Sequence, residues 1–132
     1  MKRKKQKPKQ KGQRKKKLNN FYYQGDIIII MVGNQIGSEQ KLIYRPCVVL
    51  QNDKGNTYGN TTIVSPLTKK HKKSNMPTHY VLTKDKYKFL KYDSMVLCEQ
   101  LRTIDISRVK KKIGSISDFD IQKITEKVNK NF

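Results

Sequence analysis

The chain has 132 residues, with 30 Lys and Arg against 10 Asp and Glu, so its formal net charge is +20. This length suits one domain rather than two, and the charge favours an anionic partner such as nucleic acid or an acidic protein. The sequence has no apolar run long enough to span a bilayer. No apolar segment follows the basic N-terminus, so we expect no secretory signal, no membrane association and a cytoplasmic location.

Basic residues concentrate at the N-terminus. Residues 2–17 carry eleven Lys or Arg and no acid, whereas residues 18–132 have nineteen basic and ten acidic residues, a net charge of +9. A segment with so few apolar side chains cannot bury enough surface to offset the entropy lost on ordering. We therefore expect residues 1–20 to be a disordered basic tail and residues 21–132 to form the folded domain.

The first half of the domain has the pattern of β-structure. The run DIIIIMV (26–32) predicts a strand that is buried on both faces, and the Gly, Asn and Ser content of 33–40 predicts a loop. Residues 46–52 predict a second strand beginning at Pro46, where a missing N–H does least harm. The two glycines in 53–60 indicate a turn.

The second half continues with short strands. We expect strands over 61–67, 78–83 and 94–100, a basic loop between the first two, and an irregular or edge strand over 101–107. In that last segment Arg102, Ile104 and Ile106 alternate with the remaining residues.

The C-terminus carries the signals of a helix. Ser117 is a good N-cap with Asp120 as its capping-box partner, while Ile116 and Ile121 occupy the hydrophobic staple positions. Many short strands followed by one helix predict a mainly β fold with a C-terminal helix, arranged as a small twisted barrel.

Few residues outside this framework carry obvious chemistry. Cys47 and Cys98 lie in apolar runs and are expected to be buried free thiols. No phosphate-binding Gly-rich loop, zinc spacing or nucleophile elbow is present, so we expect no metal and no cofactor. His71 lies among lysines as one more cation, and for His79 a structural role is the simpler interpretation.

Seven short motifs nevertheless occur in a fixed order along residues 21–130: QGDI (24–27), GSEQ (37–40), RPCVVLQND (45–53), TIVSPLT (62–68), MPTH (76–79), DSMVLCEQLRTID (93–105) and IGSISDFDIQKI (113–124). In their order and spacing they resemble the MazF/PemK toxins, and they look most like the Gram-positive branch of MazF.

The resemblance implies a small SH3-like barrel of the plasmid-toxin (CcdB/PemK/MazF) type, a homodimer, and the toxin of a type II toxin-antitoxin system. It further implies a metal-independent endoribonuclease that cuts single-stranded RNA, including mRNA, within a short sequence and so inhibits translation and growth. The products would carry a 2′,3′-cyclic phosphate and a 5′-hydroxyl. The implied partner is an acidic antitoxin with a flexible segment.

The same resemblance assigns catalysis to Arg45, Thr68 and Glu99. The planar, permanently charged fork of Arg45 suits the extra negative charge that develops on phosphorus, although a strand-flanking role is the simpler alternative. Thr68 would hydrogen-bond a phosphate oxygen, whereas a strand-end threonine taken alone would be ordinary surface. Glu99 is the candidate general base.

The remaining residues assigned by the resemblance would bind RNA. Base or backbone contacts are expected from Ser38, Glu39, Gln40, Asn52, Met76, His79 and Gln100, and sequence-independent phosphate contacts from Lys69, Lys70, Lys72 and Lys73. The chain departs from the plasmid-borne branch, whose histidine, arginine and aspartate correspond to Ser38, Leu97 and Glu99. It also carries the bulky residues Leu42, Ile43 and Tyr44 where small residues are common, which favours a different loop closure or target sequence.

Two non-catalytic functions remain as alternatives. The same barrel occurs in CcdB toxins, which poison gyrase by binding it, and a basic barrel can also coat nucleic acid. The joint presence of Arg45 and Thr68 favours the nuclease. Association with a membrane surface would need apolar residues beside the charge, and residues 1–20 offer almost none.

Overall fold

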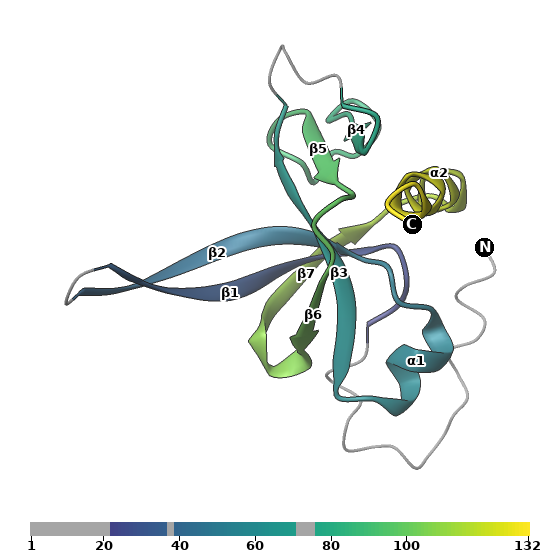
Figure 1. The fold of residues 1–132 in the computed structure, drawn as a ribbon. Coiled ribbons are helices and arrows are strands. Elements are labelled where there is room, and N and C mark those ends of the chain that lie inside the picture. Colours follow the sequence, from purple (N-terminus) through teal and green to yellow (C-terminus); the bar gives the residue numbers. More distant parts are fainter. Residues whose placement is uncertain (1–21, 37–38, 71–75) are drawn as a thin grey trace.

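A single antiparallel sheet of seven strands and one long helix make up most of the molecule (Figure 1). The computed structural model describes residues 22–36, 39–70 and 76–132, so the predicted tail 1–20 lies outside it. The elements are β1 (Asp26–Ile36), β2 (Glu39–Val49), α1 (Asp53–Tyr58), β3 (Thr61–Lys69), β4 (His79–Leu82), β5 (Ser94–Leu97), β6 (Arg102–Asp105), the short 3-10 helix η3 (Ile106–Arg108), β7 (Val109–Ser115) and α2 (Asp118–Asn129).

Neighbouring strands follow the order β4-β5-β3-β2-β1-β7, and β6 is a branch that pairs with β3. The first part of β3 pairs with β2 and β6, whereas its last three residues, Leu67 to Lys69, pair with β5. The β1–β2 arm and the β4–β5 pair therefore diverge from β3 (Figure 1). Among the described strands, β4, β6 and β7 each have one neighbour. The predicted mainly β fold with a C-terminal helix is confirmed, but the strand pairing is open rather than closed into a complete barrel.

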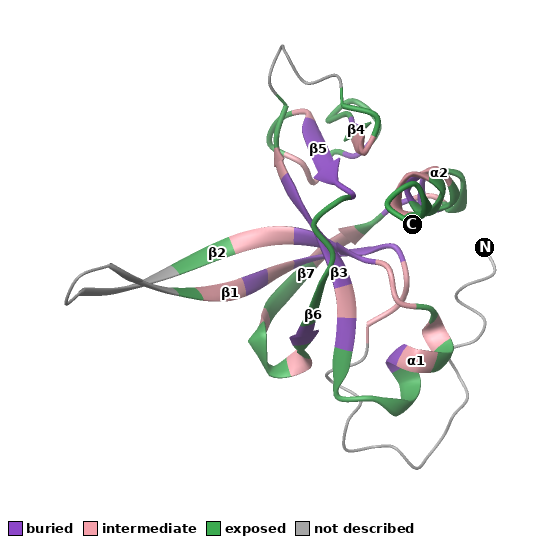
Figure 2. Cartoon of the chain, viewed as in Figure 1, coloured by how far each residue is buried: buried purple, intermediate pink, exposed green. Residues whose placement is uncertain are grey.

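The apolar run of β1 supplies side chains to two separate cores. Ile27 is buried in the larger core, while Ile28 and Ile30 are buried in the smaller core on the opposite face, because successive side chains of a strand point to opposite faces. The prediction of a strand buried on both faces is thus confirmed. Buried segments accordingly meet where β1, β2 and β3 cross (Figure 2).

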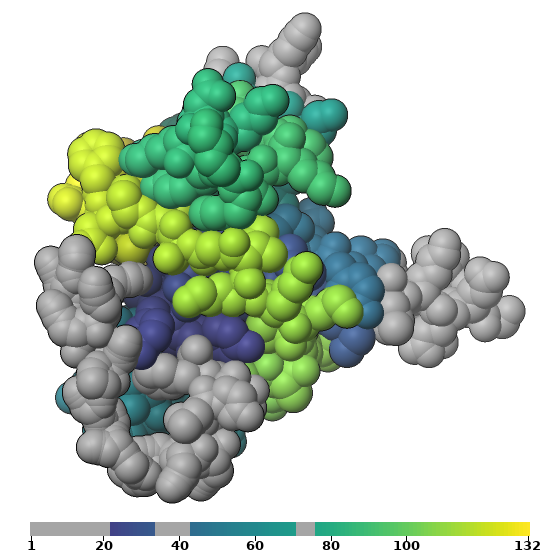
Figure 3. All heavy atoms as spheres, turned by 180° about the vertical axis from the view of Figure 1, so that it is seen from behind, coloured from purple at the N-terminus to yellow at the C-terminus, as the bar shows by residue number. Residues whose placement is uncertain are grey.

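The helix α2 covers the larger core. Ile116, Ile121 and Ile124 pack there against strand residues that include Val48 and Val96. On the face shown in Figure 3, residues 83–92 lie next to β7. The ring of Phe89 packs directly on Gly114, because a Cβ atom added to this glycine would be 2.3 Å from the nearest ring carbon. The smaller core consists of Ile28, Ile30, Cys47, Val49, Val64 and Ile104.

The start of α2 follows the predicted cap, with one difference. Ser117 accepts a hydrogen bond from the backbone N–H of Asp120 at 3.2 Å, as expected for an N-cap. The carboxylate of Asp120, however, accepts hydrogen bonds from the hydroxyls of Tyr80 and Tyr87, the first at 2.5 Å. It also forms an ion pair with the ammonium group of Lys86 at 3.0 Å. Asp120 is 5 % exposed, and a buried carboxylate takes the strongest donors that tertiary structure provides.

Three local predictions are wrong, and one strand was not predicted. Residues 33–40 were predicted as a loop, but β1 continues to Ile36 and β2 begins at Glu39, because a ladder of backbone hydrogen bonds needs no apolar side chains. Pro46 lies within β2, opposite Ile29, and not at its start. Only a turn was predicted over 53–60, but residues 53–58 form α1, which Asn52 caps by accepting a hydrogen bond from the backbone N–H of Gly55 at 2.9 Å.

The fourth difference is β7, a strand that the sequence pattern did not predict. It pairs with β1 through its backbone and carries the exposed Lys110, Lys111 and Lys112. Lysines on an exposed edge are a common protection against pairing with another chain. No helix in the described residues is long and apolar enough to cross a membrane.

Candidate functional site

Arg45 lies in the middle of β2, opposite Ile30 of β1. Side chains two residues apart in a strand share a face, so Arg45 is on the face of Cys47 and Val49, which are buried in the smaller core. Arg45 itself is only partly buried. Its guanidinium therefore emerges at the rim of the smaller core, on a strand that is paired on both sides at Cys47.

Thr68 lies at the matching position of β3. The β2–β3 pairing ends at Cys47 opposite Pro66, and Arg45 and Thr68 each stand two residues beyond this pair. From Leu67 onward β3 pairs with β5, and Thr68 lies opposite Met95. The two predicted catalytic residues thus lie on the two sides of one fork, where the β1–β2 arm separates from β3 and β5 (Figure 1).

The thiol at the base of this fork is chemically inert. Burial raises the pKa of Cys47 to about 12, even though the positive charges of Arg45 and, more weakly, Arg102 lower it. Burial also raises the pKa of Cys98 to about 11. Both cysteines are buried and free, which confirms the prediction, and a protonated buried thiol is a poor nucleophile.

His79 and Glu99 form a second polar group. His79 opens β4, opposite Leu97 at the end of β5, and Glu99 follows two residues later. The His79 Nε2 and Glu99 Oε2 atoms are 3.3 Å apart. Partial burial would raise the pKa of Glu99, but hydrogen bonds from its own backbone N–H and from His79 outweigh it, so the pKa lies below its ordinary value. Glu99 is therefore ionised at neutral pH.

The other predicted RNA contacts are distributed around these two groups. Gln100 and Met76 are exposed, and Lys69 and Lys70 are exposed at the end of β3, where the Lys69 ammonium lies 5.2 Å from the centre of the Tyr92 ring. Asn52 is the N-cap of α1, so its side chain has a structural role. Ser38, Lys72 and Lys73 lie outside the described residues, and Glu39 and Gln40 are described only as backbone of β2.

Arg102 was missed by the sequence analysis. It begins β6 opposite Val64 of β3, on the face of Ile104, which is buried in the smaller core. The alternation of Arg102 with Ile104 was visible in the sequence. Without the pairing of β6 to β3, however, nothing indicated that this face continues to the one that carries Arg45.

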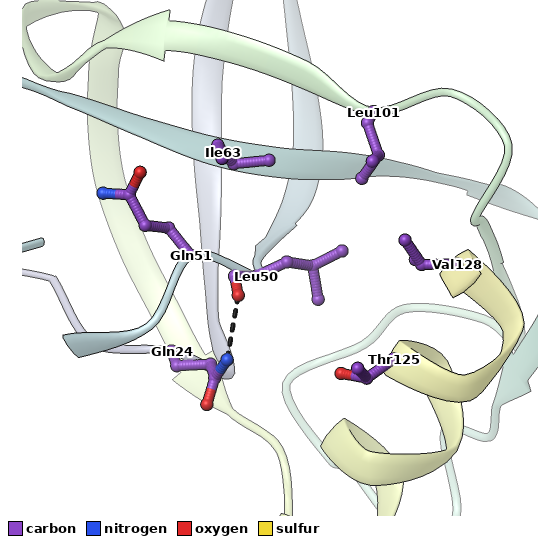
Figure 4. A pocket seen from close by; sticks show the side chains of 7 residues that line it. All are labelled: Gln24, Leu50, Gln51, Ile63, Leu101, Thr125 and Val128. Carbon is purple, nitrogen blue, oxygen red and sulfur yellow. Dashed lines mark hydrogen bonds between the residues drawn. The ribbon is translucent and has the colours of Figure 1, made fainter. Parts of the chain in front are cut away.

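A pocket of about 170 Å³ lies elsewhere, beside α2 (Figure 4). The Gln24 amide donates a hydrogen bond to the Leu50 carbonyl across its edge. None of the predicted catalytic residues takes part in the lining, which consists of Gln24, Leu50, Gln51, Ile63, Leu101, Thr125 and Val128.

Comparison with known proteins decides the family. Residues 23–132 match the family described as PemK-like, MazF-like toxin of type II toxin-antitoxin system. The chain belongs to this family. The resemblance seen in the motifs is confirmed, and with it the class of toxin.

Relatives and solved structures agree with the assignment to this family. The chain is 40% identical over 105 residues to a protein named Endoribonuclease MazF from Staphylococcus saprophyticus, covering 80% of this chain and 86% of the relative. A MazE–MazF crystal structure from Deinococcus radiodurans matches with a TM-score of 0.67 at 18% identity, covering 83% of this chain and 94% of that one. The Mycobacterium tuberculosis toxin MazF-mt6 matches with a TM-score of 0.63 at 18% identity, covering 80% and 93%.

Proposed function

We propose that this toxin is an endoribonuclease that cuts single-stranded RNA at the fork between β2 and β3. One observation carries the proposal: in a chain of this family, Arg45 and Thr68 stand equally far beyond the Cys47–Pro66 pair, on the two sides of the fork. The activity named for the relative from Staphylococcus saprophyticus supports it.

The reaction is attack of a ribose 2′-hydroxyl on the adjacent phosphorus. The bond between phosphorus and the 5′-oxygen of the next nucleotide breaks. The departing oxygen takes a proton from water, which leaves a 2′,3′-cyclic phosphate and a 5′-hydroxyl. Negative charge accumulates on the phosphoryl oxygens during this step. A fixed guanidinium beside them lowers the barrier, because it is already oriented when the charge develops. Arg45 fills this role, and the Thr68 hydroxyl donates a hydrogen bond to a phosphoryl oxygen.

Glu99 is the proposed acceptor of the 2′-hydroxyl proton, with His79 holding its carboxylate in place. The lowered pKa of Glu99 makes it a weak base, since efficient bases have a pKa near the working pH. We therefore assign most of the rate enhancement to charge stabilisation by Arg45 and a smaller part to proton removal. Exposed Gln100 and Met76 are the proposed contacts to bases.

The proposed partners are an acidic antitoxin and a second copy of the chain, and the proposed location is the cytoplasm. An acidic segment suits a protein of net charge +20.

The contact between two copies is proposed to involve exposed Leu101 and partly buried Val128 of α2, since apolar side chains at a surface suit such a contact. Light scattering at low micromolar concentration should detect a dimer, and a fully active monomer would contradict this part of the proposal.

Cleavage is expected to persist in excess EDTA. The roles above are filled by side chains alone, and no group of three or more His, Cys, Asp or Glu gathers within the described residues. The experiment incubates the purified protein with a long defined RNA, with and without EDTA, and maps the new 5′ ends. A gyrase poison or an RNA-coating protein would release no fragments, and activity lost in EDTA but restored by a divalent cation would contradict the mechanism.

The basic tail is proposed to add sequence-independent contacts to phosphates. Its eleven cations lie outside the described residues, and the proposal rests on their charge alone. Deleting residues 2–18 should weaken RNA binding at low salt and flatten the dependence of log affinity on log salt. The cut sequence should stay the same, because phosphate contacts carry no sequence information. Equal slopes for both proteins, or a changed cut sequence, would contradict this role.

A further inference from the structure

Arg102 emerges on the same face of the sheet as Arg45. Directly paired residues of neighbouring strands point to the same side, and Arg102 of β6 pairs with Val64 of β3, which pairs in turn with Val49 of β2. Val64 and Val49 are both buried in the smaller core. Arg45 lies four residues before Val49 in β2 and therefore shares its face.

Both arginines lie on the face of the sheet that carries the buried Cys47. Their positive charges lower the pKa of its thiol, Arg45 more than Arg102. Neither arginine belongs to an ion pair among the described residues, where the pairs are His79–Glu99, Lys86–Asp120, Lys112–Asp26 and Lys123–Glu126. Two cations on one face, with no carboxylate paired to either of them among the described residues, favour an external anion.

Their surroundings differ in a way that separates their roles. Arg45 is partly buried in a strand with neighbours on both sides, whereas Arg102 is exposed at the first residue of a four-residue strand. The offset of four residues separates their Cα atoms by roughly 13 Å along the strand direction, and the two strand spacings from β6 to β2 add roughly 10 Å across the sheet. The exposed side chain of Arg102, at this distance from Arg45, suits a second phosphate that stays solvated. The scissile phosphate, which must be oriented, is left to Arg45.

We propose that Arg102 binds the RNA phosphate next to the scissile one, so that Arg45 and Arg102 together hold two consecutive phosphates across the rim of the smaller core. This assignment rests on the proposed RNA cleavage and adds a residue to it. A neighbouring phosphate carries the same charge in the ground state and in the transition state, so this contact contributes to binding and not to the chemical step.

The test compares Arg102→Ala and Arg102→Lys with the unchanged protein. For Arg102→Ala we expect KM to rise roughly five- to tenfold at low salt, with kcat within about twofold. The slope of log affinity against log salt should fall by about 0.7, the value for one phosphate contact on a single strand. Arg102→Lys should keep the slope and most of the affinity, because a point charge suffices for a solvated phosphate.

Lys130→Ala is the matched control. It also removes one exposed positive charge, but at the end of α2, which covers the larger core on the opposite face. Its KM should change less than twofold, and melting curves of all three variants should coincide with that of the unchanged protein. An Arg102→Ala protein with unchanged KM and salt slope would overturn the proposal, as would a fall in kcat comparable to that of Arg45→Ala.

Binding is also measured without cleavage, on a single-stranded RNA in which every 2′-hydroxyl is replaced by 2′-O-methyl. This measurement separates the two proposals. If the unchanged protein cuts no RNA, the proposed function fails, whereas an unchanged salt slope for Arg102→Ala on the methylated RNA means that Arg102 contacts no phosphate.

Discussion

Arg45→Ala is expected to lower the rate of RNA cleavage by about a hundredfold or more, the loss typical of removing one preorganised charge donor from a reaction centre. The residue lies at the rim of the smaller core and is only partly buried, so its truncation leaves the packing of Cys47 and Val49 intact. RNA binding should fall far less than the cleavage rate. Single-turnover cleavage of a defined RNA, together with its dissociation constant, measures both quantities.

Arg45→Lys is the informative companion variant. It should recover little activity, because an ammonium group cannot donate the two parallel hydrogen bonds of a guanidinium. This distinguishes Arg45 from Arg102, where lysine should suffice. An Arg45→Ala protein that stays within about tenfold of the unchanged rate would show that the arginine only helps to position the RNA.

Asp120→Ala is expected to cause the largest loss of stability. The buried carboxylate accepts hydrogen bonds from Tyr80 and Tyr87 and pairs with Lys86, which joins the start of α2 to β4 and to the segment after it. Removing the acceptor leaves these donors without a partner and should lower the free energy of unfolding by about 2–3 kcal/mol. The melting temperature should fall by roughly 10 °C or more.

Asp118→Ala is the control for this effect. Asp118 is an exposed acid in the same first turn of α2, so both substitutions remove a negative charge that favours the helix N-terminus. The control should cost less than about 1 kcal/mol. If the two variants melt at the same temperature, the hydrogen bonds to Asp120 contribute nothing beyond the charge.

The contribution of Asp120 should also depend on pH. Burial alone would raise the pKa of this carboxyl, but hydrogen bonds from Tyr80, Tyr87 and Lys86 outweigh it and hold the pKa below its ordinary value. A lowered pKa means that the folded state binds the proton more weakly than the unfolded state. The stabilisation is therefore fully present above the unfolded pKa of about 3.9 and is lost as the pH falls through the folded value. Melting temperatures of the unchanged protein and Asp120→Ala should converge in acid.

The sequence predicted the elements whose apolar side chains repeat with a structural period. The isoleucines of β1 and of α2 define buried faces, and both elements were predicted, because burial leaves a regular pattern in the sequence. The strand β7 carries three consecutive lysines and is held by backbone pairing with β1, which leaves no such pattern. Residues 33–40, which include the end of β1 and the start of β2, were predicted as a loop for the same reason.

The motifs single out Arg45, Thr68 and Glu99 as a candidate site, and that assignment stays a prediction. How these residues are placed relative to one another depends on strand register, which a single sequence does not specify. The contact of His79 with Glu99 follows from the pairing of β4 with β5, and the place of Arg102 follows from the pairing of β6 with β3. Both are relations between residues distant in the sequence.

The central claim is that a ribose 2′-hydroxyl attacks the phosphorus held at the fork between β2 and β3. The most direct test first maps the cut site on a defined RNA and then replaces the single nucleotide that precedes the cut with its 2′-deoxy form. The account predicts that cleavage at that position is abolished, while binding of the RNA changes little. Cleavage that continues at the deoxy position would require attack by water and would contradict the mechanism built on Arg45, Thr68 and Glu99.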